Sequence, residues 1–211
     1  MKNAKHYLIG IAGGSGSGKT SFLRELMNHF TQEEVALVSQ DNYYHPKDVQ
    51  LADDNGVLNF DLPTSIDRHH FYEDMMRLSR NETIEKLEYN FNNPLWEPEK
   101  VVVQSAPIII MEGLFVFHYE EIKNQLDFMV YIDVHHEERL HRRIKRDGQE
   151  RGFPEHEVRY QWHNHVRPAE EKYLDPFIQS CDLVVDNTFH YREGLNVLVT
   201  NIQEQLKKFK S

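Results

Sequence analysis

Short apolar runs recur along this chain, and amphipathic segments separate most of them. The runs are Tyr7–Ala12, Val35–Ser39, Pro107–Met111, Phe128–Ile132 and Leu183–Val185. Continuous apolar character is typical of strands that are covered on both faces. Alternation of such strands with helices is typical of a parallel sheet. The pattern therefore predicts an α/β fold in which five parallel strands lie between two layers of helices.

Two other patterns occupy the chain between these runs. Apolar residues recur at helical spacing in residues 22–30, 66–78 and 195–206, which predicts three helices. In residues 87–103, apolar Leu87, Tyr89 and Phe91 alternate with polar residues before the turn signal Asn92-Asn93-Pro94, and the apolar run Val101–Val103 follows it. Alternation around a turn predicts a β-hairpin outside the main sheet. Such an insertion could wall a substrate pocket.

A glycine-rich segment joins the first apolar run to the first helical pattern. It consists of Gly13, Gly14, Ser15, Gly16, Ser17, Gly18, Lys19 and Thr20, and it fits G-x-x-x-x-G-K-[ST]. Glycines let backbone N–H groups turn inward around phosphate oxygens, and the helix N-terminus adds its positive dipole end. Lys19 can then reach the β- and γ-phosphates, and the Thr20 hydroxyl can ligate Mg²⁺. A flexible linker does not stand between a buried strand and a helix, so the segment predicts a nucleotide triphosphate site.

Composition narrows the class of protein. The 211 residues are 39% hydrophobic and 27% charged, which is typical of one folded domain spanning residues 1–211. A formal net charge of −10 argues against a general nucleic-acid binder. The longest apolar stretch, Pro107–Phe117, is too short to span a membrane. The single cysteine, Cys181, excludes an intrachain disulfide. We therefore expect a cytoplasmic protein with neither a nucleic-acid nor a membrane partner.

Acidic residues follow two of the predicted strands. Asp41 comes after the second apolar run, and Glu112 comes after the third. In parallel sheets, ligands bind beyond the carboxyl ends of the strands. Phosphoryl transfer needs oxygen ligands for Mg²⁺ and a carboxylate that accepts the proton of the attacking hydroxyl. Asp41 and Glu112 are candidates for both roles, and the alternatives are a turn shaped by Asp41 and a strand end at Glu112.

Basic and aromatic residues provide further candidates. Arginines over transferring phosphates stabilise transition-state charge. The alternative for a cluster of basic residues is a solvated helix face on which they pair with acids. We expect about two or three of the six clustered basic residues here to be functional. The six are Arg139, Arg142, Arg143, Lys145, Arg146 and Arg151. Flat rings beside Asp41 and on the hairpin could grip a base or sugar, or belong to the core. These rings are Tyr43, Tyr44, Tyr89 and Phe91. The thirteen histidines lack zinc-site spacing, so we expect them to be surface or packing residues.

Taken together, these residues resemble the uridine kinase (uridine–cytidine kinase) family of P-loop kinases. The similarity runs from about Ile9 to Asn187. Its landmarks are GIAGGSGSGKTSF, VSQDNYY, FDLPTSID, YNF, IIIMEG, RLHRRIKRDGQERG and YQWHNHVRP. The resemblance implies a three-layer αβα P-loop fold, with a hairpin insertion at about 83–105 and a lid at about 139–155. It also implies phosphorylation of the 5′-hydroxyl of uridine or cytidine in pyrimidine salvage, with ATP or GTP as donor and Mg²⁺ as cofactor.

The resemblance also assigns roles to individual residues. It implies that Asp41 is the base for the sugar hydroxyl and organises Mg²⁺ with Thr20 and Glu112. It implies that Asp61 binds ribose hydroxyls, and that Arg146 and Arg151 act with Lys19 on the ATP phosphates. The residues that it places against the nucleoside are Tyr44, Tyr89, Phe91, Arg143 and Gln161. Members of the family are typically homotetramers, so a homo-oligomer is expected.

Two positions depart from the family pattern. Pro94 stands where the family commonly has a histidine that contacts the pyrimidine, and Phe153 stands where it has an arginine. A pocket without these polar groups could take another acceptor, such as another nucleoside, nicotinamide riboside, pantothenate or a sugar phosphate. A nucleotide-dependent switch is a second alternative, because Asp53–Gly56 matches D-x-x-G, although no N-K-x-D sequence accompanies it.

Overall fold

A five-stranded parallel sheet forms the centre of the molecule. The computed structural model describes residues 6–90 and 97–210. The strands lie in the order β2, β5, β1, β6, β7, and every neighbouring pair is parallel. Their bounds are Tyr7–Ala12 for β1, Val35–Ser39 for β2, Ile108–Glu112 for β5, Phe128–Asp133 for β6 and Leu183–Asp186 for β7. The five predicted strands are therefore confirmed, and Glu112 is the last residue of β5 rather than the first residue after it.

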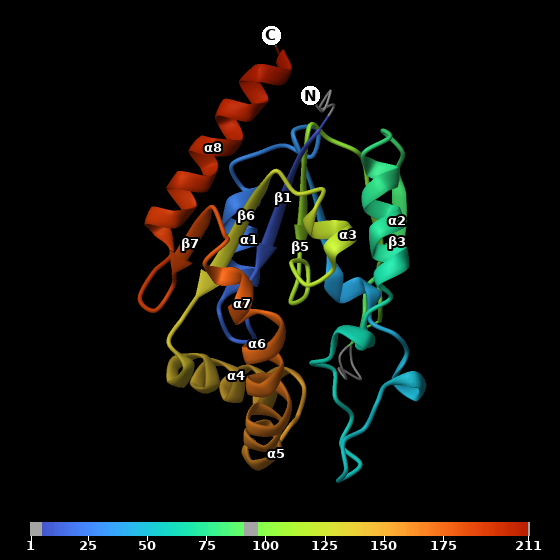
Figure 1. Ribbon diagram of the computed structural model, residues 1–211, viewed down its shortest axis with the longest axis vertical. Coiled ribbons are helices and arrows are strands. Elements are labelled where there is room, and N and C mark those ends of the chain that lie inside the picture. The colour runs from blue at the N-terminus through green and yellow to red at the C-terminus, as the bar shows by residue number, and fades with distance from the viewer. Residues whose placement is uncertain (1–5, 91–96, 211) are drawn as a thin grey trace.

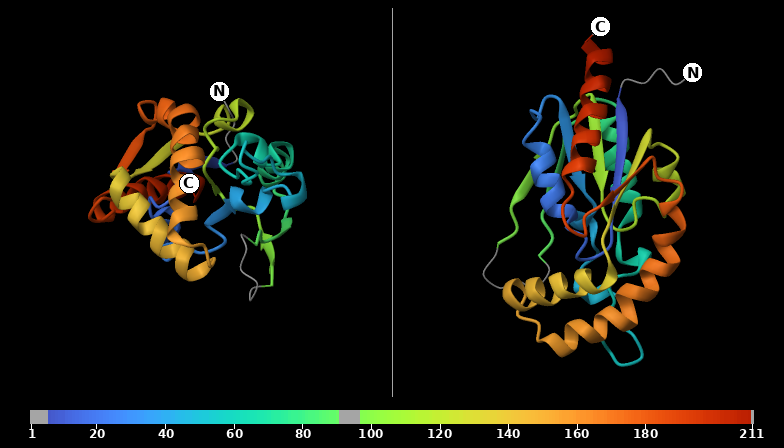
Figure 2. Two further views of the ribbon diagram at one scale, coloured as in Figure 1. Left: turned by 90° about the horizontal axis from the view of Figure 1, so that it is seen from below. Right: turned by 90° about the vertical axis from the view of Figure 1, so that its left-hand side faces the viewer.

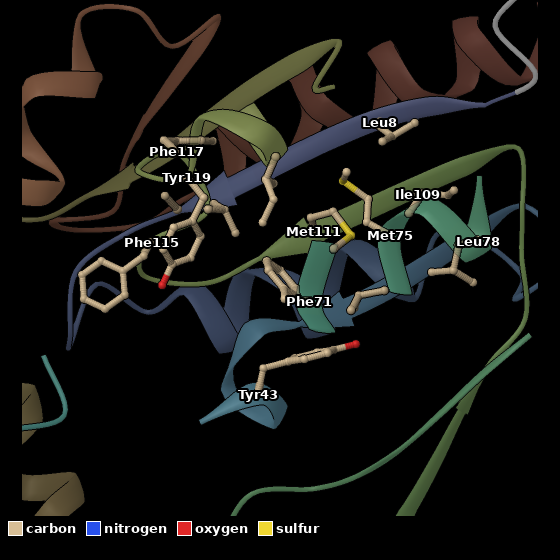
Figure 3. Packing of buried hydrophobic residues seen from close by; sticks show 14 of the residues in the cluster. Leu8, Tyr43, Phe71, Met75, Leu78, Ile109, Met111, Phe115, Phe117 and Tyr119 are labelled. Atoms are coloured by element: carbon tan, nitrogen blue, oxygen red, sulfur yellow. The ribbon is translucent and has the colours of Figure 1, made fainter. Parts of the chain in front are cut away.

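Helices cover both faces of this sheet, as Figures 1 and 2 show. α1 (Lys19–Met27) and α8 (Arg192–Lys210) pack on one face, and α2 (Arg68–Leu78) and α3 (Glu120–Lys123) pack on the other. Side chains of β1 alternate between the two cores: Leu8 belongs to the core under α2, and Ile9 belongs to the core under α1. Figure 3 shows the α2 core, in which Phe71, Met75 and Leu78 face the sheet. The predicted three-layer αβα fold is confirmed.

The remaining helices gather near the carboxyl ends of the strands (Figure 1). α4 (His136–Glu150) and α5 (Glu155–Gln161) are followed by a π-helical turn, η4 (Trp162–Val166), and by α6 (Arg167–Tyr173) and α7 (Asp175–Ile178). Three short 3₁₀ helices lie between β2 and α2, namely η1 (Gln40–Tyr43), η2 (Lys47–Val49) and η3 (Pro63–Ser65). No helix in residues 6–90 or 97–210 combines the length and apolar character that a membrane crossing requires.

The predicted hairpin is a separate two-stranded antiparallel sheet. β3 (Ile84–Leu87) pairs with β4 (Lys100–Val103), so Tyr89 lies beyond the strand that it was expected to continue. The helix expected over residues 66–78 begins at Arg68, because the Asp67 side chain accepts a hydrogen bond from the His70 N–H at 3.1 Å and caps the helix.

Candidate active site

The glycine-rich segment forms a tight loop between β1 and α1. Gly16 and Gly18 have φ angles of 79° and 83°, a left-handed conformation that glycine adopts without strain. A Cβ on Gly16 would collide with the backbone carbonyl of Arg139, so α4 packs closely against the outside of the loop. No side chain caps α1. An uncapped helix N-terminus preceded by such a loop suits phosphate oxygens.

A cavity of about 600 Å³ lies beside this loop. Its volume is in the range of small-molecule sites. The cavity brings together most of the residues that the sequence singled out, from the loop, from η1 and from the helices around α4. Those that line it are Gly13, Gly14, Ser15, Gly16, Ser17, Gly18, Lys19, Thr20, Asp41, Tyr44, Asp61, Arg142, Arg143, Arg146, Arg151, Phe153 and Gln161.

Among the described residues to which the resemblance assigned a role, Glu112 and Tyr89 do not line the cavity. Glu112 contacts the lining residue Lys19 instead: its Oε2 forms an ion pair with the Lys19 ammonium. Tyr89 packs against Tyr44, with ring centroids 5.4 Å apart, and its hydroxyl donates to the His45 carbonyl at 3.4 Å. Phe91, like Pro94, lies outside the described residues.

Charges around Lys19 are strongly coupled. Burial by itself disfavours the Lys19 ammonium, but the negative charges of Glu112 and Asp41 outweigh it and raise the pKa of Lys19. Burial raises the pKa of Asp41, and the charge of Glu112 adds to that rise, while Lys19 opposes it. A half-buried carboxyl with a raised pKa is a better proton acceptor than an ordinary aspartate. The site thus holds one cation between two carboxylates.

The turn that carries Asp41 is anchored from both sides. The Asp41 N–H donates to Ser39 Oγ at 3.3 Å, and the neighbouring Gln40 accepts from the Phe115 N–H at 2.8 Å, which ties η1 to the loop after β5. Tyr43 is a core residue, 2% exposed, and its hydroxyl donates to the buried Asp74 of α2 at 2.9 Å.

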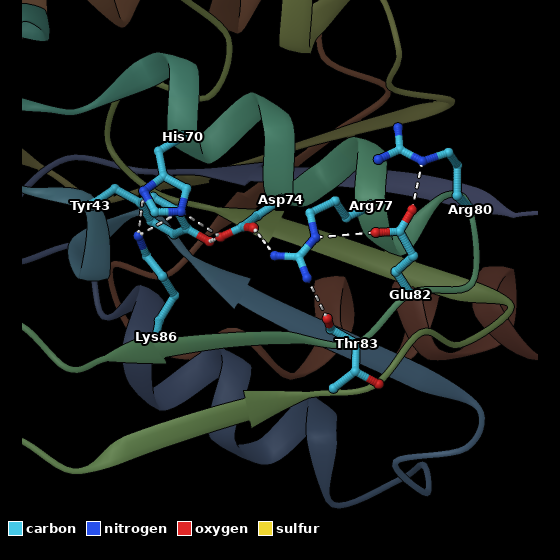
Figure 4. A network of polar contacts seen from close by, with 8 residues as sticks. All are labelled: Tyr43, His70, Asp74, Arg77, Arg80, Glu82, Thr83 and Lys86. Atoms are coloured by element: carbon cyan, nitrogen blue, oxygen red, sulfur yellow. Dashed lines mark hydrogen bonds and ion pairs between the residues drawn. The ribbon is translucent and has the colours of Figure 1, made fainter.

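Figure 4 shows how Asp74 links this turn to the hairpin. Asp74 also receives Arg77 at 3.2 Å, and Lys86 of β3 lies over the Tyr43 ring at 4.0 Å from its centroid. A network of this kind restrains side chains whose individual contacts are weak. The position of Asp41 therefore depends on α2 and on the hairpin as well as on β2.

The basic cluster divides into structural and cavity-facing members. Arg139 is 2% exposed and forms a buried ion pair with Glu170, and its Nε donates to the Ser15 carbonyl at 3.1 Å. Arg142 lines the cavity and donates to the carbonyls of Asn187 and Thr188, both at 3.2 Å. Arg139 therefore holds the loop from outside, whereas Arg142 also reaches the cavity.

One buried carboxylate gathers the other three arginines. Asp147, which is 1% exposed, lies 3.2 Å from Arg143, 2.8 Å from Arg146 and 3.3 Å from Arg151. Burial lowers the pKa of Arg151, and the charge of Arg146 adds to this effect while Asp147 opposes it. The alternative of a solvated helix face paired with acids would place Asp147 at the surface, and local sequence cannot distinguish a buried aspartate from an exposed one.

Arg143 connects the phosphate loop to the far side of the cavity. Its guanidinium donates to Ser15 Oγ and to Gln161 Oε1, both at 2.9 Å. Arg143 and Gln161, which the sequence placed against the substrate, therefore contact each other across the junction of α4 and α5. Asp61 lines the cavity together with Phe60 and Tyr44. The ring centroids of Phe60 and Tyr44 are 6.0 Å apart. The Asn59 side chain forms an Asx turn here, because its Oδ1 accepts a hydrogen bond from the Asp61 N–H at 2.9 Å.

Sequence reasoning missed several residues that line the cavity. They are Ser21, Lys47, Val57, Leu58, Phe60, Leu114, Glu157 and His165. His165 is 2% exposed and was expected to be a surface or packing residue. Phe60 could have been found from the sequence, because it is an aromatic residue next to Asp61 in the FDLP motif. Val57 and Leu58 could not, because they lie in a polar loop with no strand or helix periodicity.

The donor atoms near the loop suit magnesium. Thr20, Asp41 and Glu112 offer one hydroxyl and two carboxylates, and oxygen ligands are what Mg²⁺ prefers. Within residues 6–90 and 97–210, no three His, Cys, Asp or Glu side chains form a metal-binding cluster. Because Mg²⁺ retains waters and shares phosphate oxygens, a sparse donor set beside a phosphate loop fits an ion that binds together with a nucleotide.

Comparison with known proteins supports a relationship along nearly the whole chain. Residues 8–190 match the family described as "Phosphoribulokinase / Uridine kinase family". A uridine kinase from Brevibacillus brevis is 33% identical over 195 residues, covering 92% of this chain and 91% of the relative. A uridine kinase from Borrelia garinii subsp. bavariensis is 35% identical over 202 residues, covering 95% and 96%.

A solved structure supports the fold. The structure of a possible uridine kinase from Bacillus stearothermophilus superposes with a TM-score of 0.61 and 19% identity, covering 87% of this chain and 90% of that one. At this identity the likeness concerns the three-layer fold alone.

Proposed function

Since the chain belongs to the phosphoribulokinase/uridine kinase family, we propose that it transfers the γ-phosphoryl group of ATP to the 5′-hydroxyl of a nucleoside, with uridine or cytidine preferred. One observation carries the proposal: a single cavity joins the phosphate loop to Asp41 and to Asp61. A donor site and an acceptor site must share one space for direct transfer.

The proposed reaction assigns a distinct task to each wall. The oxygen of the acceptor hydroxyl attacks the γ-phosphorus, and Asp41 accepts the proton of that hydroxyl. The new O–P bond forms while the bond from the γ-phosphorus to the bridging oxygen breaks, and that oxygen leaves with ADP. Asp61 holds the sugar hydroxyls, Tyr44, Arg143 and Gln161 face the rest of the acceptor, and Tyr89 packs behind the Tyr44 ring.

Cations from two elements balance the charge that develops on the phosphates. Lys19 comes from the start of α1, and Arg146 and Arg151 come from α4 and its C-terminus. Thr20, Asp41 and Glu112 would hold Mg²⁺, which supplies further positive charge at the phosphate oxygens. Since Glu112 already forms an ion pair with Lys19, the lysine is restrained at the edge of the phosphate loop before a nucleotide arrives.

A substrate panel tests the proposal. ADP release is measured with uridine, cytidine, purine nucleosides and nicotinamide riboside as acceptors, and with ATP or GTP as donor. We expect uridine or cytidine to have the highest kcat/KM, with ATP as the preferred donor. Absence of turnover with every nucleoside would overturn the proposal.

The assignment of the base has its own test. In Asp41→Asn, kcat should fall by about 10²–10⁴-fold because the proton acceptor is lost, while ATP binding by calorimetry stays close to that of wild type. Asp48→Asn, which changes an exposed acid in η2, is the matched control. Normal turnover of Asp41→Asn would refute the role of Asp41.

A second acceptor class deserves the same panel because Phe153 lines the cavity, at the position where the family pattern has an arginine. An apolar ring there favours an acceptor that offers fewer hydrogen-bonding groups at that wall. The panel therefore includes pantothenate and a sugar phosphate, and higher kcat/KM for either than for uridine would reassign the acceptor.

The switch alternative has less support. Its D-x-x-G match rests on Asp53, whose carboxylate accepts hydrogen bonds from Tyr160 and from backbone N–H groups of its own loop.

The proposal further includes a single domain over residues 1–211, a cytoplasmic location, a homotetrameric assembly and no nucleic-acid partner. Light scattering of the purified protein tests the tetramer, and an electrophoretic mobility assay tests nucleic-acid binding.

A further inference from the structure

The loop of residues 51–58 folds back on itself beside the cavity. A β-bridge pairs Ala52 with Leu58, and the Asp53 N–H donates to the Val57 carbonyl at 2.9 Å. Gly56 permits the turn with a φ of 78°. Val57 and Leu58 line the cavity, and the chain then continues directly to Asp61. This loop is therefore one wall of the acceptor half of the cavity.

Asp53 contacts two separate parts of the protein through its two carboxylate oxygens. Oδ1 accepts from the N–H groups of Asn55 and Val57, both at 2.9 Å, and so holds the loop together. Oδ2 accepts from the Tyr160 hydroxyl at 2.7 Å and lies 2.8 Å from His165 Nε2. An ionised carboxylate can only accept, so the His165 ring donates through Nε2.

The partners of Oδ2 belong to the opposite wall. Tyr160 precedes Gln161, whose amide oxygen receives the Arg143 guanidinium at 2.9 Å. His165 lies in the π-helical turn η4, lines the cavity, and has its ring edge-on to Tyr160 with centroids 5.9 Å apart. Asn55 adds a second bond between the walls, because its Nδ2 donates to the Tyr160 hydroxyl at 2.6 Å.

These bonds join positions that are 105 to 112 residues apart in the chain. Bonds to neighbouring residues close the loop itself: the Asn59 N–H donates to the Leu51 carbonyl, and the Asp53 N–H donates to the Val57 carbonyl. The contacts of Asp53 with Tyr160 and His165, together with the bond from Asn55 to Tyr160, therefore hold this wall to α5 and η4.

We propose that Asp53, Tyr160 and His165 form a clasp that sets the spacing between the two walls of the acceptor half, which makes Asp53 and Tyr160 positioning residues for acceptor binding. The inference rests on the proposed nucleoside kinase activity for its kinetic effect. The bonds of Asp53 and Tyr160 given above hold cavity residues Val57 and His165 and include none to the phosphate loop, so we expect loosening the clasp to act on the acceptor rather than on ATP. Low exposure of His165 keeps water from competing for the Asp53 oxygen on that side.

Two substitutions open the clasp with little change of shape. Tyr160→Phe removes the hydroxyl that donates to Asp53 and accepts from Asn55, and it leaves the bonds inside the loop intact. Asp53→Asn removes the charge but keeps an acceptor oxygen. The matched controls are Tyr72→Phe, a half-buried tyrosine of α2 that does not line the cavity, and Asp54→Asn, an exposed acid next to Asp53.

The kinetic test separates KM for the acceptor from KM for ATP. We expect Tyr160→Phe and Asp53→Asn each to raise the acceptor KM about tenfold, with the KM for ATP within about twofold of wild type and with both controls unchanged. The effects of the two substitutions should be less than additive in the double variant, because both weaken the bond between Tyr160 and Asp53. An unchanged acceptor KM, or a parallel rise in the KM for ATP, would overturn the clasp.

A second measurement does not depend on turnover. Hydrogen exchange of the ligand-free protein should become faster in residues 51–58 in Tyr160→Phe but not in Tyr72→Phe. Unchanged exchange in Tyr160→Phe would overturn the clasp whether or not a nucleoside is turned over. A wild-type protein that phosphorylates no nucleoside but shows the faster exchange in the variant would instead overturn the proposed function and leave the clasp standing.

Discussion

Asp147 is the carboxylate whose loss should be most costly near the active site. It is 1% exposed, and it is shared by Arg143, Arg146 and Arg151, whose side chains are 8%, 34% and 25% exposed. Asp147→Asn keeps the size of the side chain and removes its charge. The three guanidinium groups then lie close together without the carboxylate that separates them.

The magnitude follows from the exposure of each partner. Removing one member of a buried ion pair costs about 3–5 kcal/mol, which applies to Arg143. Partly exposed pairs are worth about 0–1 kcal/mol each, which applies to Arg146 and Arg151. Because asparagine still offers one acceptor oxygen, we expect the free energy of unfolding to fall by about 3 kcal/mol. For a domain of this size, that loss lowers Tm by about 6–12 °C.

Urea unfolding and thermal unfolding of wild type and Asp147→Asn measure this loss. Glu150→Gln is the matched control, because Glu150 is an exposed residue at the end of the same helix, and it should change stability by less than about 0.5 kcal/mol. kcat should also fall in Asp147→Asn, since Arg146 and Arg151 lose their common anchor. A stability loss below about 1 kcal/mol would refute the view that one buried carboxylate organises these arginines.

Two further predictions concern glycine and cysteine. Gly16→Ala should weaken ATP binding in calorimetry because the new Cβ meets the Arg139 carbonyl, whereas Gly56→Ala, at a similar positive φ but with open space around it, should cost only about 1–2 kcal/mol of stability; equal ATP affinity of the two variants would contradict the close contact. Burial, with the charge of Asp182, raises the pKa of Cys181 to about 12, so at pH 8 its thiolate should be about a thousandfold scarcer than at the usual pKa of 9.0. Alkylation by iodoacetamide should therefore be slow in the folded protein and fast after denaturation, and similar rates would refute the shift.

Local sequence was enough to predict the sheet and the phosphate loop. Each buried strand is a short apolar run, and the G-x-x-x-x-G-K-[ST] motif needs no distant residue to be recognised. The bounds that moved did so for local reasons of capping and strand length: Asp67 caps α2, and Glu112 remains within β5. Asp41 became a candidate through its position after a predicted strand, whereas Asp61 became one only through the family resemblance.

The sequence by itself determined the five strands of the main sheet in their succession along the chain, the phosphate loop and the family. Tertiary structure alone decided which charged residues are buried and which partners they meet. Asp53 matched an unrelated short motif, yet its carboxylate bonds to Tyr160, 107 residues away. Asp147 looked like one more acid on a helix face, and burial makes it the anchor of three arginines. The physical reason is that hydrophobic periodicity is local, whereas burial and charge pairing depend on how distant elements pack together.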